Sequence, residues 1–166
     1  MSAVAGTKLI YLYRLYSERA TADGTRIALT TEDELSISAD ADSTATKDGS
    51  VRGASVAELE KTMTSLMDSD DPMIGKMKSA LLNGSLIELW EVNLDKPVTG
   101  QTGKFSGTYY QGYLTEFTAS SPADGNVEVS MTVGINGKGA DGNVTVDASQ
   151  QDDEQYTFAD TPKTNA

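Results

Sequence analysis

The segment GNVEVSMTVGINGKGADG, residues 125–142, alternates between apolar and polar positions. One side carries Val127, Val129, Met131, Val133 and Ile135, and the other carries Glu128, Ser130, Thr132, Gly134 and Asn136. A period of two is typical of a β-strand that buries one face. The pattern predicts such a strand. Its polar face, by the commonest reading, contacts bulk water.

The beginning of the chain also has the composition of β-strands. Residues 9–16, LIYLYRLY, are apolar or aromatic on both faces, so a strand here needs cover on two sides. The turn sequence ADGT precedes RIALT at residues 26–30, which predicts a hairpin with a short second strand.

Residues 34–40 alternate as the opening segment does, with Leu35 and Ile37 opposite acidic and serine side chains. Further strands are expected at residues 85–94 and 104–120. The sequence SPADGN that follows them predicts a turn before the opening segment.

One helix is predicted at residues 70–82. Asp70 and Asp71 stand where a helix needs an N-cap, and Pro72 suits the first turn. Asn83-Gly84 is a typical C-terminal stop. The apolar stripe consists of Met73, Ile74, Met77, Ala80 and Leu81. We expect that stripe to pack on the strands.

The segment SVAELEKTMTSLM, residues 55–67, fits two structures by pattern alone. One side of a helix would carry Val56, Leu59, Met63 and Leu66, and one face of a strand would carry Ala57, Leu59 and Met63. Ser55 and Glu58 also resemble a capping box. Periodicity by itself favours the helix.

Two polar regions are expected to lie outside the core. Residues 40–54 contain only one apolar residue larger than alanine, Val51, which predicts a long loop. Long loops in compact domains tend to be functional. Residues 148–166 are acidic and rich in Gln and Thr, which predicts an arm that is flexible or docks on a neighbouring subunit, with Tyr156 and Phe158 as its anchors. Residues 1–147 then form one domain.

Composition excludes several classes of function. Lys and Arg total 13 against 25 acidic residues, and the formal charge of −12 opposes binding to nucleic acid or anionic lipid. Cysteine and histidine are absent, so the chain lacks disulfides, a thiolate nucleophile and the usual general base. We expect no signal peptide and no membrane span, and therefore synthesis in a reducing cytosol.

No motif indicates a cofactor or catalysis. Gly137, Gly139 and Gly142 match G-x-G-x-x-G, but a strand-like run follows them, which favours a glycine-rich turn over dinucleotide binding. DADSTATKDG resembles a calcium loop without its required glycine and glutamate. No spacing singles out a carboxylate pair for acid-base chemistry. Neither an enzyme nor a cofactor is expected.

Four short sequences occur in the order found in one family. They are Lys47-Asp48-Gly49, Leu89-Trp90-Glu91-Val92, GTYYQGY at residues 107–113 and INGKG at residues 135–139. With the first strand they cover nearly the whole chain. The chain resembles the major tail proteins of long, non-contractile-tailed phages, in particular the branch found in phages of lactococci and related Gram-positive hosts.

This resemblance implies a tail tube subunit in the virion, assembled in the host cytoplasm. The implied fold is a mainly β, two-sheet β-sandwich with one flanking helix, similar to the type VI secretion tube protein. The family has a strand at residues 55–67, so we expect a strand there. The implied partners are copies of the chain in stacked hexameric rings, the tape measure protein in the lumen, and the terminator and distal tail proteins.

In such a tube the polar strand faces would look into the channel through which DNA is ejected. The expected lining residues are Glu34, Asp40, Glu58, Glu60, Thr62, Glu128, Ser130 and Thr132. An acidic lining repels DNA weakly and lets it pass without specific binding. The residues expected to contact the neighbouring ring are Thr46, Lys47, Asp48, Gly49, Ser50, Val51 and Arg52.

Two alternatives stay open on the sequence alone. A carbohydrate- or host-binding β-sandwich module of another virion component would use Trp90 and Tyr109 to Tyr113 as a stacking platform. An acid-base hydrolase would need two carboxylates with distinct environments.

Overall fold

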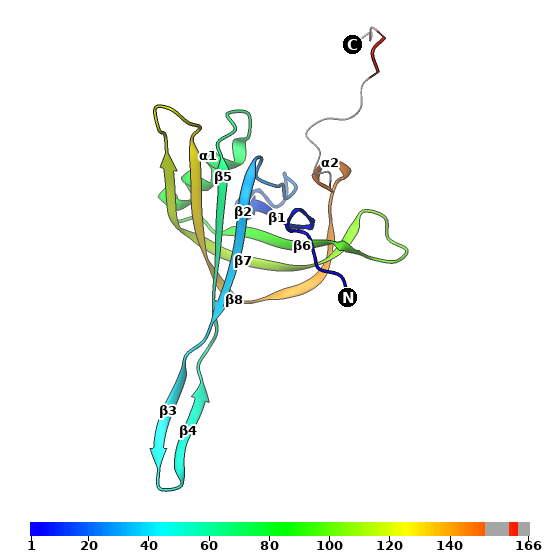
Figure 1. Cartoon of the computed structure of the whole chain (residues 1–166). Helices are drawn as coiled ribbons and strands as arrows, with labels where there is room; N and C mark the ends of the chain where they lie inside the picture. The colour runs from blue at the N-terminus through cyan, green and yellow to red at the C-terminus, as the bar shows by residue number, and fades with distance from the viewer. Residues whose placement is uncertain (152–159, 163–166) are drawn as a thin grey trace.

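The computed structural model describes residues 1–151 and 160–162 and shows a mainly β protein (Figure 1). The strands in these residues are β1 (Leu9–Leu15), β2 (Thr30–Ser38), β3 (Ala41–Thr46), β4 (Gly49–Ala54), β5 (Glu58–Leu66), β6 (Ile87–Pro97), β7 (Lys104–Ser120) and β8 (Glu128–Thr145). The α-helices are α1 (Pro72–Asn83) and the short α2 (Ala148–Gln151), and the 3-10 turns are η1 (Gly6–Lys8) and η2 (Tyr16–Glu18). Two sheets and one flanking helix confirm the predicted fold class.

The larger sheet folds over itself into two layers. Its strand order is β1-β6-β7-β8-β5-β2, whereas β3 and β4 form a separate two-stranded sheet. The long strands β7 and β8 run through both layers, because β6 pairs with β7 only up to Gly112 and β5 pairs with β8 only up to Ile135. One layer contains β1, β6 and residues 104–112 of β7. The other contains β2, β5 and residues 113–120 of β7.

Glycines lie where β8 passes from one layer to the other. Gly137 and Gly139 have φ angles of 70° and 80°, and a Cβ on Gly139 would approach the Tyr110 ring to 2.5 Å. The pairing of β7 with β8 also shifts register between Tyr109 and Gln111. Left-handed glycines and a bulge together bend a strand. The glycine-rich turn predicted here is therefore wrong, because these residues form the bent part of a continuous strand.

The ambiguous segment at residues 55–67 contains strand β5, as the family resemblance implies. Its buried residues are Leu59, Lys61, Met63 and Ser65. The buried residues recur with a period of two, but two of them, Lys61 and Ser65, are polar. The hydrophobic pattern of the sequence therefore does not reveal the strand. Pairing with β2 on one side and β8 on the other satisfies the backbone of β5. That tertiary context overrides the helical pattern.

Residues 40–54 contain a β-hairpin, not the irregular loop that their polarity predicts. β3 and β4 pair from Ala41 with Ala54 to Thr46 with Gly49, and the hairpin extends away from the body (Figure 1). All residues of the two strands are exposed. Backbone pairing and a two-residue turn form the hairpin without a core, and a hydrophobic pattern does not detect such an element.

The short second strand predicted at residues 26–30 is not formed. Tyr13 and Thr25 make one isolated bridge, and β2 begins only at Thr30. Between these points the buried Ile27 side chain anchors the chain, and the Ala28 amide donates a 2.8 Å hydrogen bond to Asp71. Side-chain contacts therefore hold residues 26–30 in place of the backbone pairing that a hairpin strand would have made.

Helix α1 begins and ends as its sequence predicts. Asp71 Oδ1 accepts the Met73 amide at 2.9 Å, and Gly84 ends the helix with a φ of 64°. The buried stripe consists of Met73, Ile74, Met77 and Ala80. It packs on β7 and β1. The capping signals are local, so the sequence alone locates this helix.

The main core lies between the two layers and α1. It includes Leu59, Met63, Val129, Met131 and Val133 from one layer and Tyr11, Tyr13, Ile87, Leu89 and Tyr110 from the other. Burial of each large apolar side chain contributes roughly 1.5–3 kcal/mol. A second cluster contains Ile10, Leu12, Val92, Phe105 and Val146. Because β1 contributes to both clusters, the prediction that it needs cover on two sides is confirmed.

The first residues of the predicted C-terminal arm pack on the domain. Residues 148–151 form α2, where Gln150 Oε1 accepts the Arg26 amide at 2.9 Å. Gln151 Nε2 donates to the Val146 carbonyl at 2.7 Å. These hydrogen bonds connect Gln150 and Gln151 at the start of the expected arm to the domain. The expected anchors Tyr156 and Phe158 lie outside the described residues.

Candidate functional surfaces

The outer face of the layer formed by β2, β5, β8 and β7 is polar and acidic. Pairing places the following residues in rows across the strands: Ser36, Glu60, Gly134 and Tyr113; Glu34, Thr62, Thr132 and Glu116; Glu32, Thr64, Ser130 and Thr118. Glu58 and Glu128 stand at the two ends of this acidic face. The described residues of these rows include no Lys or Arg.

Most of the predicted lining residues share the acidic face. They are Glu34, Glu58, Glu60, Thr62, Glu128, Ser130 and Thr132. Asp40 does not belong to it, because Asp40 follows the end of β2 and its carbonyl accepts the Ser55 amide at 2.8 Å. Glu32 and Glu116 were missed. The alternation of β2 would have found Glu32, but a register shift before Glu116 changes the phase of β7.

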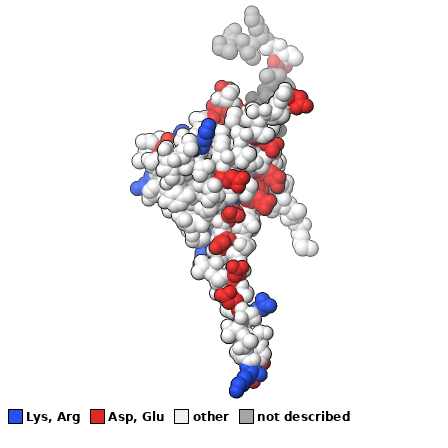
Figure 2. Space-filling model, turned by 90° about the vertical axis from the view of Figure 1, so that its left-hand side faces the viewer, with Lys and Arg blue, Asp and Glu red and all other residues white. Residues whose placement is uncertain are grey.

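Acidic side chains continue from the body toward the hairpin. Figure 2 shows Asp and Glu atoms in a line along the body and onto the hairpin, with Lys and Arg atoms near the hairpin's far end. The basic residues of the hairpin are Lys47 and Arg52. A surface lined by one sign of charge repels polyanions.

Both lateral edges of the acidic layer lack a strand partner within the described chain. β2 pairs only with β5, and residues 113–120 of β7 pair only with β8. Unpaired amides and carbonyls on such edges are templates for pairing with another chain. The layer can therefore extend sideways through further copies.

The hairpin carries the residues predicted to contact a neighbouring ring, Thr46 to Arg52. The Thr46 hydroxyl closes the turn by donating to the Gly49 carbonyl at 2.5 Å, and Gly49 takes a φ of 122° that favours glycine. Val51 is 60% exposed. An exposed valine on an element that projects from the body is available to another molecule.

Sequence reasoning missed a buried ion pair between the layers. Lys61 Nζ lies 2.6 Å from Asp33 Oδ1 and donates to the Thr62 carbonyl at 3.0 Å. Burial lowers the pKa of Lys61, and the Asp33 carboxylate opposes that shift. The only sequence signal is one lysine on an alternating strand, and a lysine there is usually exposed.

Two tyrosines complete this cluster. The Tyr11 hydroxyl donates to Glu91 Oε2 at 2.5 Å, and Lys61 Nζ lies 4.1 Å from the Tyr11 ring centroid. Burial raises the pKa of Tyr11 and of Tyr13 well above the ordinary value. The Tyr13 hydroxyl has no hydrogen-bond partner among the described residues. The cluster ties β1, β2 and β5 together inside the protein, which is a structural role.

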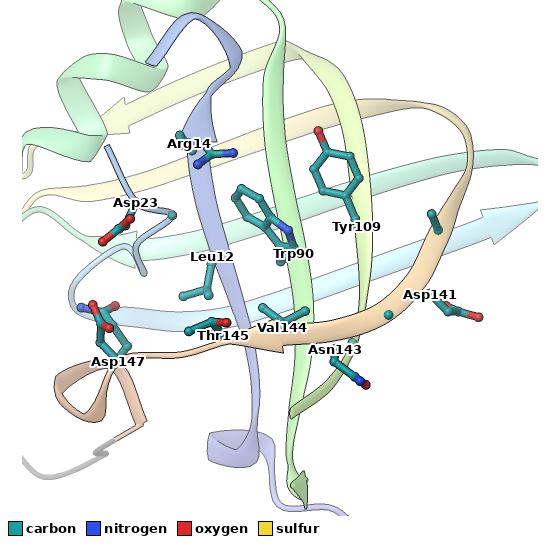
Figure 3. Close-up of a pocket in the computed structure, with 15 residues that line it drawn as sticks. Leu12, Arg14, Asp23, Trp90, Tyr109, Asp141, Asn143, Val144, Thr145 and Asp147 are labelled. Carbon is teal, nitrogen blue, oxygen red and sulfur yellow. The ribbon is translucent and has the colours of Figure 1, made fainter. Parts of the chain in front are cut away.

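A cavity of about 430 Å³ lies beside Trp90 and Tyr109 (Figure 3). The two ring centroids are 5.4 Å apart, and the Arg14 guanidinium lies 5.0 Å from the Trp90 ring. Arg14 Nε pairs with Glu88 at 3.0 Å, and Glu88 also accepts the Tyr109 hydroxyl at 2.5 Å. These polar groups already have partners within the chain.

The stacking platform predicted from Trp90 and Tyr109 to Tyr113 is not continuous. Tyr109 lines the cavity, Tyr110 is buried in the main core, and Tyr113 lies on the acidic face with 44% exposure. Successive strand residues point to opposite faces, and the bulge after Tyr109 changes the phase again. Aromatic residues adjacent in sequence are thus separated in space.

Neither a membrane span nor a metal cluster is found in the described part of the chain. In residues 1–151 and 160–162 no helix is both long and apolar enough to cross a bilayer. No group of three or more His, Cys, Asp or Glu side chains in the same residues is arranged to hold a metal ion.

Comparison with known proteins defines the class to which this fold belongs. Residues 3–141 match the phage tail tube protein family. A protein assigned to the tail of Staphylococcus phage phiMR25 is 30% identical over 161 residues, which cover 95% of this chain and 82% of that protein. The SPP1 tail tube structure is similar with a TM-score of 0.75 and 18% identity, over 99% of this chain and 95% of that chain. The tail of an empty GTA particle with C6 symmetry has a TM-score of 0.62 and 14% identity, over 83% and 98%.

The folded-over sheet with its flanking helix is therefore a tail tube fold. The chain belongs to the phage tail tube protein family and is a structural subunit of the virion tail. The family and the structural role predicted from the sequence are confirmed.

Proposed function

We propose that six copies of this chain form a ring, and that rings stack into a tube whose channel is lined by the acidic face. The observation that carries the proposal is a polar face with glutamates and no Lys or Arg in its described rows, between two sheet edges that have no strand partner in the described chain. The C6 symmetry of the GTA tail, which has the same fold, supports six copies. Six copies of a four-stranded layer exceed the 16–18 strands that already leave an aqueous channel in porins.

The charge of the lining suits passage of a polyanion. DNA carries one negative charge per ~1.7 Å of axis, so a wall of lysine or arginine would hold it by releasing counterions. The glutamates of the acidic face give DNA nothing to bind. In the assembled tail this channel would hold the tape measure protein, and DNA would pass through without specific binding.

The hairpin is the stacking element in this proposal, with Thr46 to Arg52 in contact with the adjacent ring. It projects from the body and is exposed along its length, so its residues are free to contact another copy. The ends of a finite tube would meet the terminator and distal tail proteins. The role is structural, and we assign the chain no catalytic activity.

Negative-stain electron microscopy of the purified protein tests the proposal. We expect rings or tubes with six-fold symmetry. Dispersed monomers that bind saccharide would instead support a carbohydrate-binding module, with the cavity beside Trp90 as its site. If a Trp90→Ala variant then lost saccharide binding, the cavity would be the binding site and the tube proposal would be wrong.

A further inference from the structure

The strand pair β2 and β5 has exposed apolar side chains at both of its ends. Where β2 begins, Leu29 is 47% exposed and Met67 is 41% exposed. At the other end, where the hairpin leaves the body, Ile37 is 62% exposed and Val56 is 86% exposed. Single exposed apolar residues are ordinary. Two patches at opposite ends of one strand pair are the arrangement that a head-to-tail contact requires.

Leu29 is held in an unfavourable backbone conformation. Its φ of 58° is the only positive value among the described residues other than glycine. The Leu29 carbonyl accepts the Leu66 amide at 3.0 Å, and the preceding Ala28 amide is bound by Asp71 at 2.8 Å. The neighbouring structure therefore imposes the conformation. Residues kept in such conformations cluster at functional sites, and glycine would occupy this position more easily.

The hairpin end contains a hollow of about 310 Å³. Its lining combines the apolar Ala57, Leu59 and Ile135 with residues on the side of the acidic face, namely Ser36, Ser38, Glu58, Glu60 and Gly134. Ile37 lies opposite Leu59 in the pairing of β2 with β5, so the hollow adjoins one of the exposed apolar residues. The hollow therefore marks the border between the acidic face and the exposed apolar residues of the hairpin end.

We propose that the Leu29 and Met67 end of one copy docks on the hairpin end of the next copy along the tube, covering the exposed apolar residues Ile37 and Val56. This inference rests on the proposed function and names the axial contact between rings. A contact between two different patches repeats without closing, which produces a filament. Six such contacts act together in each ring.

Engineered cysteines test the contact directly, because the natural chain contains none. Chains that carry both Leu29→Cys and Val56→Cys, assembled without wild-type chains, should give disulfide-linked dimers and higher multimers after mild oxidation. A chain with Met67→Cys and Ile37→Cys should do the same. The control combines Leu29→Cys with Leu82→Cys, whose parent residue is 76% exposed on α1. Disulfides need Cα atoms about 4.4–6.8 Å apart, so the control should stay monomeric.

A second variant separates docking from folding. Leu29→Gly relieves the left-handed backbone and removes the apolar side chain, so the isolated subunit should melt at the same or a higher temperature. Its critical concentration for tube formation should rise at least tenfold. An unchanged critical concentration would overturn the inference.

The outcomes distinguish this inference from the proposed function. Tubes that form by microscopy but give no more cross-linking in either cysteine pair than in the control would overturn the axial contact alone. A wild-type protein that never forms rings or tubes would overturn the proposed function, and the axial contact with it.

Discussion

Lys61 has an environment that few lysines have. Its side chain is fully buried, and its partner Asp33 keeps a 20% exposed side chain. A buried ion pair is weak support for stability as a whole, but removal of one partner leaves an uncompensated charge. The cost of a substitution therefore depends on which charge is left behind.

We expect Asp33→Asn to destabilise the subunit more than Lys61→Met. The first leaves the buried ammonium without its carboxylate, which should cost about 3–5 kcal/mol. The second leaves a partly solvated carboxylate and fills the space with an apolar chain, which should cost about 1–3 kcal/mol. Urea unfolding of both variants, with the double variant to give the coupling, measures this order. Equal costs, or the reverse order, would show that Lys61 is solvated in solution.

The buried tyrosines predict a loss of stability at alkaline pH. Burial raises the pKa of Tyr11 and Tyr13 above the ordinary 10.0, so the unfolded chain ionises above pH 10 while the folded chain keeps its protons. Their stabilising contribution is therefore complete below pH 10 and is lost as the pH rises further. The lowered pKa of Lys61 acts in the opposite sense, because unfolded lysine keeps its proton up to about 10.5.

The variant Tyr13→Phe isolates this effect. The Tyr13 hydroxyl has no hydrogen-bond partner in the described part of the chain, so its removal should be neutral or stabilising at pH 7 and should flatten the decline above pH 10. Tyr11→Phe is the matched comparison, because it loses the hydrogen bond to Glu91 and should cost about 1.5–3 kcal/mol at pH 7. Thermal melts from pH 8 to pH 11 measure both. A Tyr13→Phe curve as steep as that of the wild type would contradict the assignment.

At the scale of elements, the hairpin β3–β4 contributes little to the fold of its own subunit. Its strands are exposed throughout and contribute no residue to either apolar core cluster. Elements without core contacts can change at little cost to stability, so we expect the hairpin to matter for assembly and not for folding.

Replacement of Lys47 to Arg52 by a Gly-Ser linker of equal length should leave the melting temperature of the subunit nearly unchanged and block tube growth. The turn at residues 99–102 between β6 and β7 is the control, since it is another exposed turn that can be replaced by a Gly-Ser linker of its own length. Circular dichroism follows folding, and light scattering with microscopy follows growth. If the hairpin variant still formed long tubes, the hairpin would not be part of the contact between rings.

At the scale of the whole molecule, charge is distributed unevenly. The formal charge is −12, and the acidic face concentrates Glu32, Glu34, Glu58, Glu60, Glu116 and Glu128 without a cation in their rows. Exposed carboxylates contribute little to folding, so under the proposed function this arrangement serves the passage of DNA along the face.

Virions whose tubes carry Glu58→Lys, Glu60→Lys and Glu128→Lys should release DNA slowly at low salt and recover partly at high salt. Each replacement changes the charge by two, so the subunit goes from −12 to −6, and a channel wall that repelled DNA now binds it with counterion release. Subunit stability should change by about 1 kcal/mol or less, because these side chains are exposed.

The control reverses Asp23, Asp95 and Asp141, which brings the same change in net charge away from the acidic face. Tails are checked by microscopy, and DNA release is followed at several salt concentrations. Normal, salt-independent release from well-formed tails with the three glutamate replacements would mean that the acidic face looks outward at water.

The sequence by itself determined the features whose signals are local. The caps and stripe of α1, the alternation at Val129 to Val133 and the doubly apolar β1 each depend on neighbouring residues, and all three were predictable. Seven of the eight residues expected on one polar face share it, because alternation also reports which face a strand residue occupies.

Tertiary structure decided the rest. Strand β5 is a strand because β2 and β8 pair with it, and Lys61 is buried because Asp33 meets it from another strand. The bulges of β7 separate Tyr109 from Tyr113 and place Glu116 on the acidic face. Each of these outcomes depends on contacts between residues far apart in the chain, whose energies no local pattern encodes.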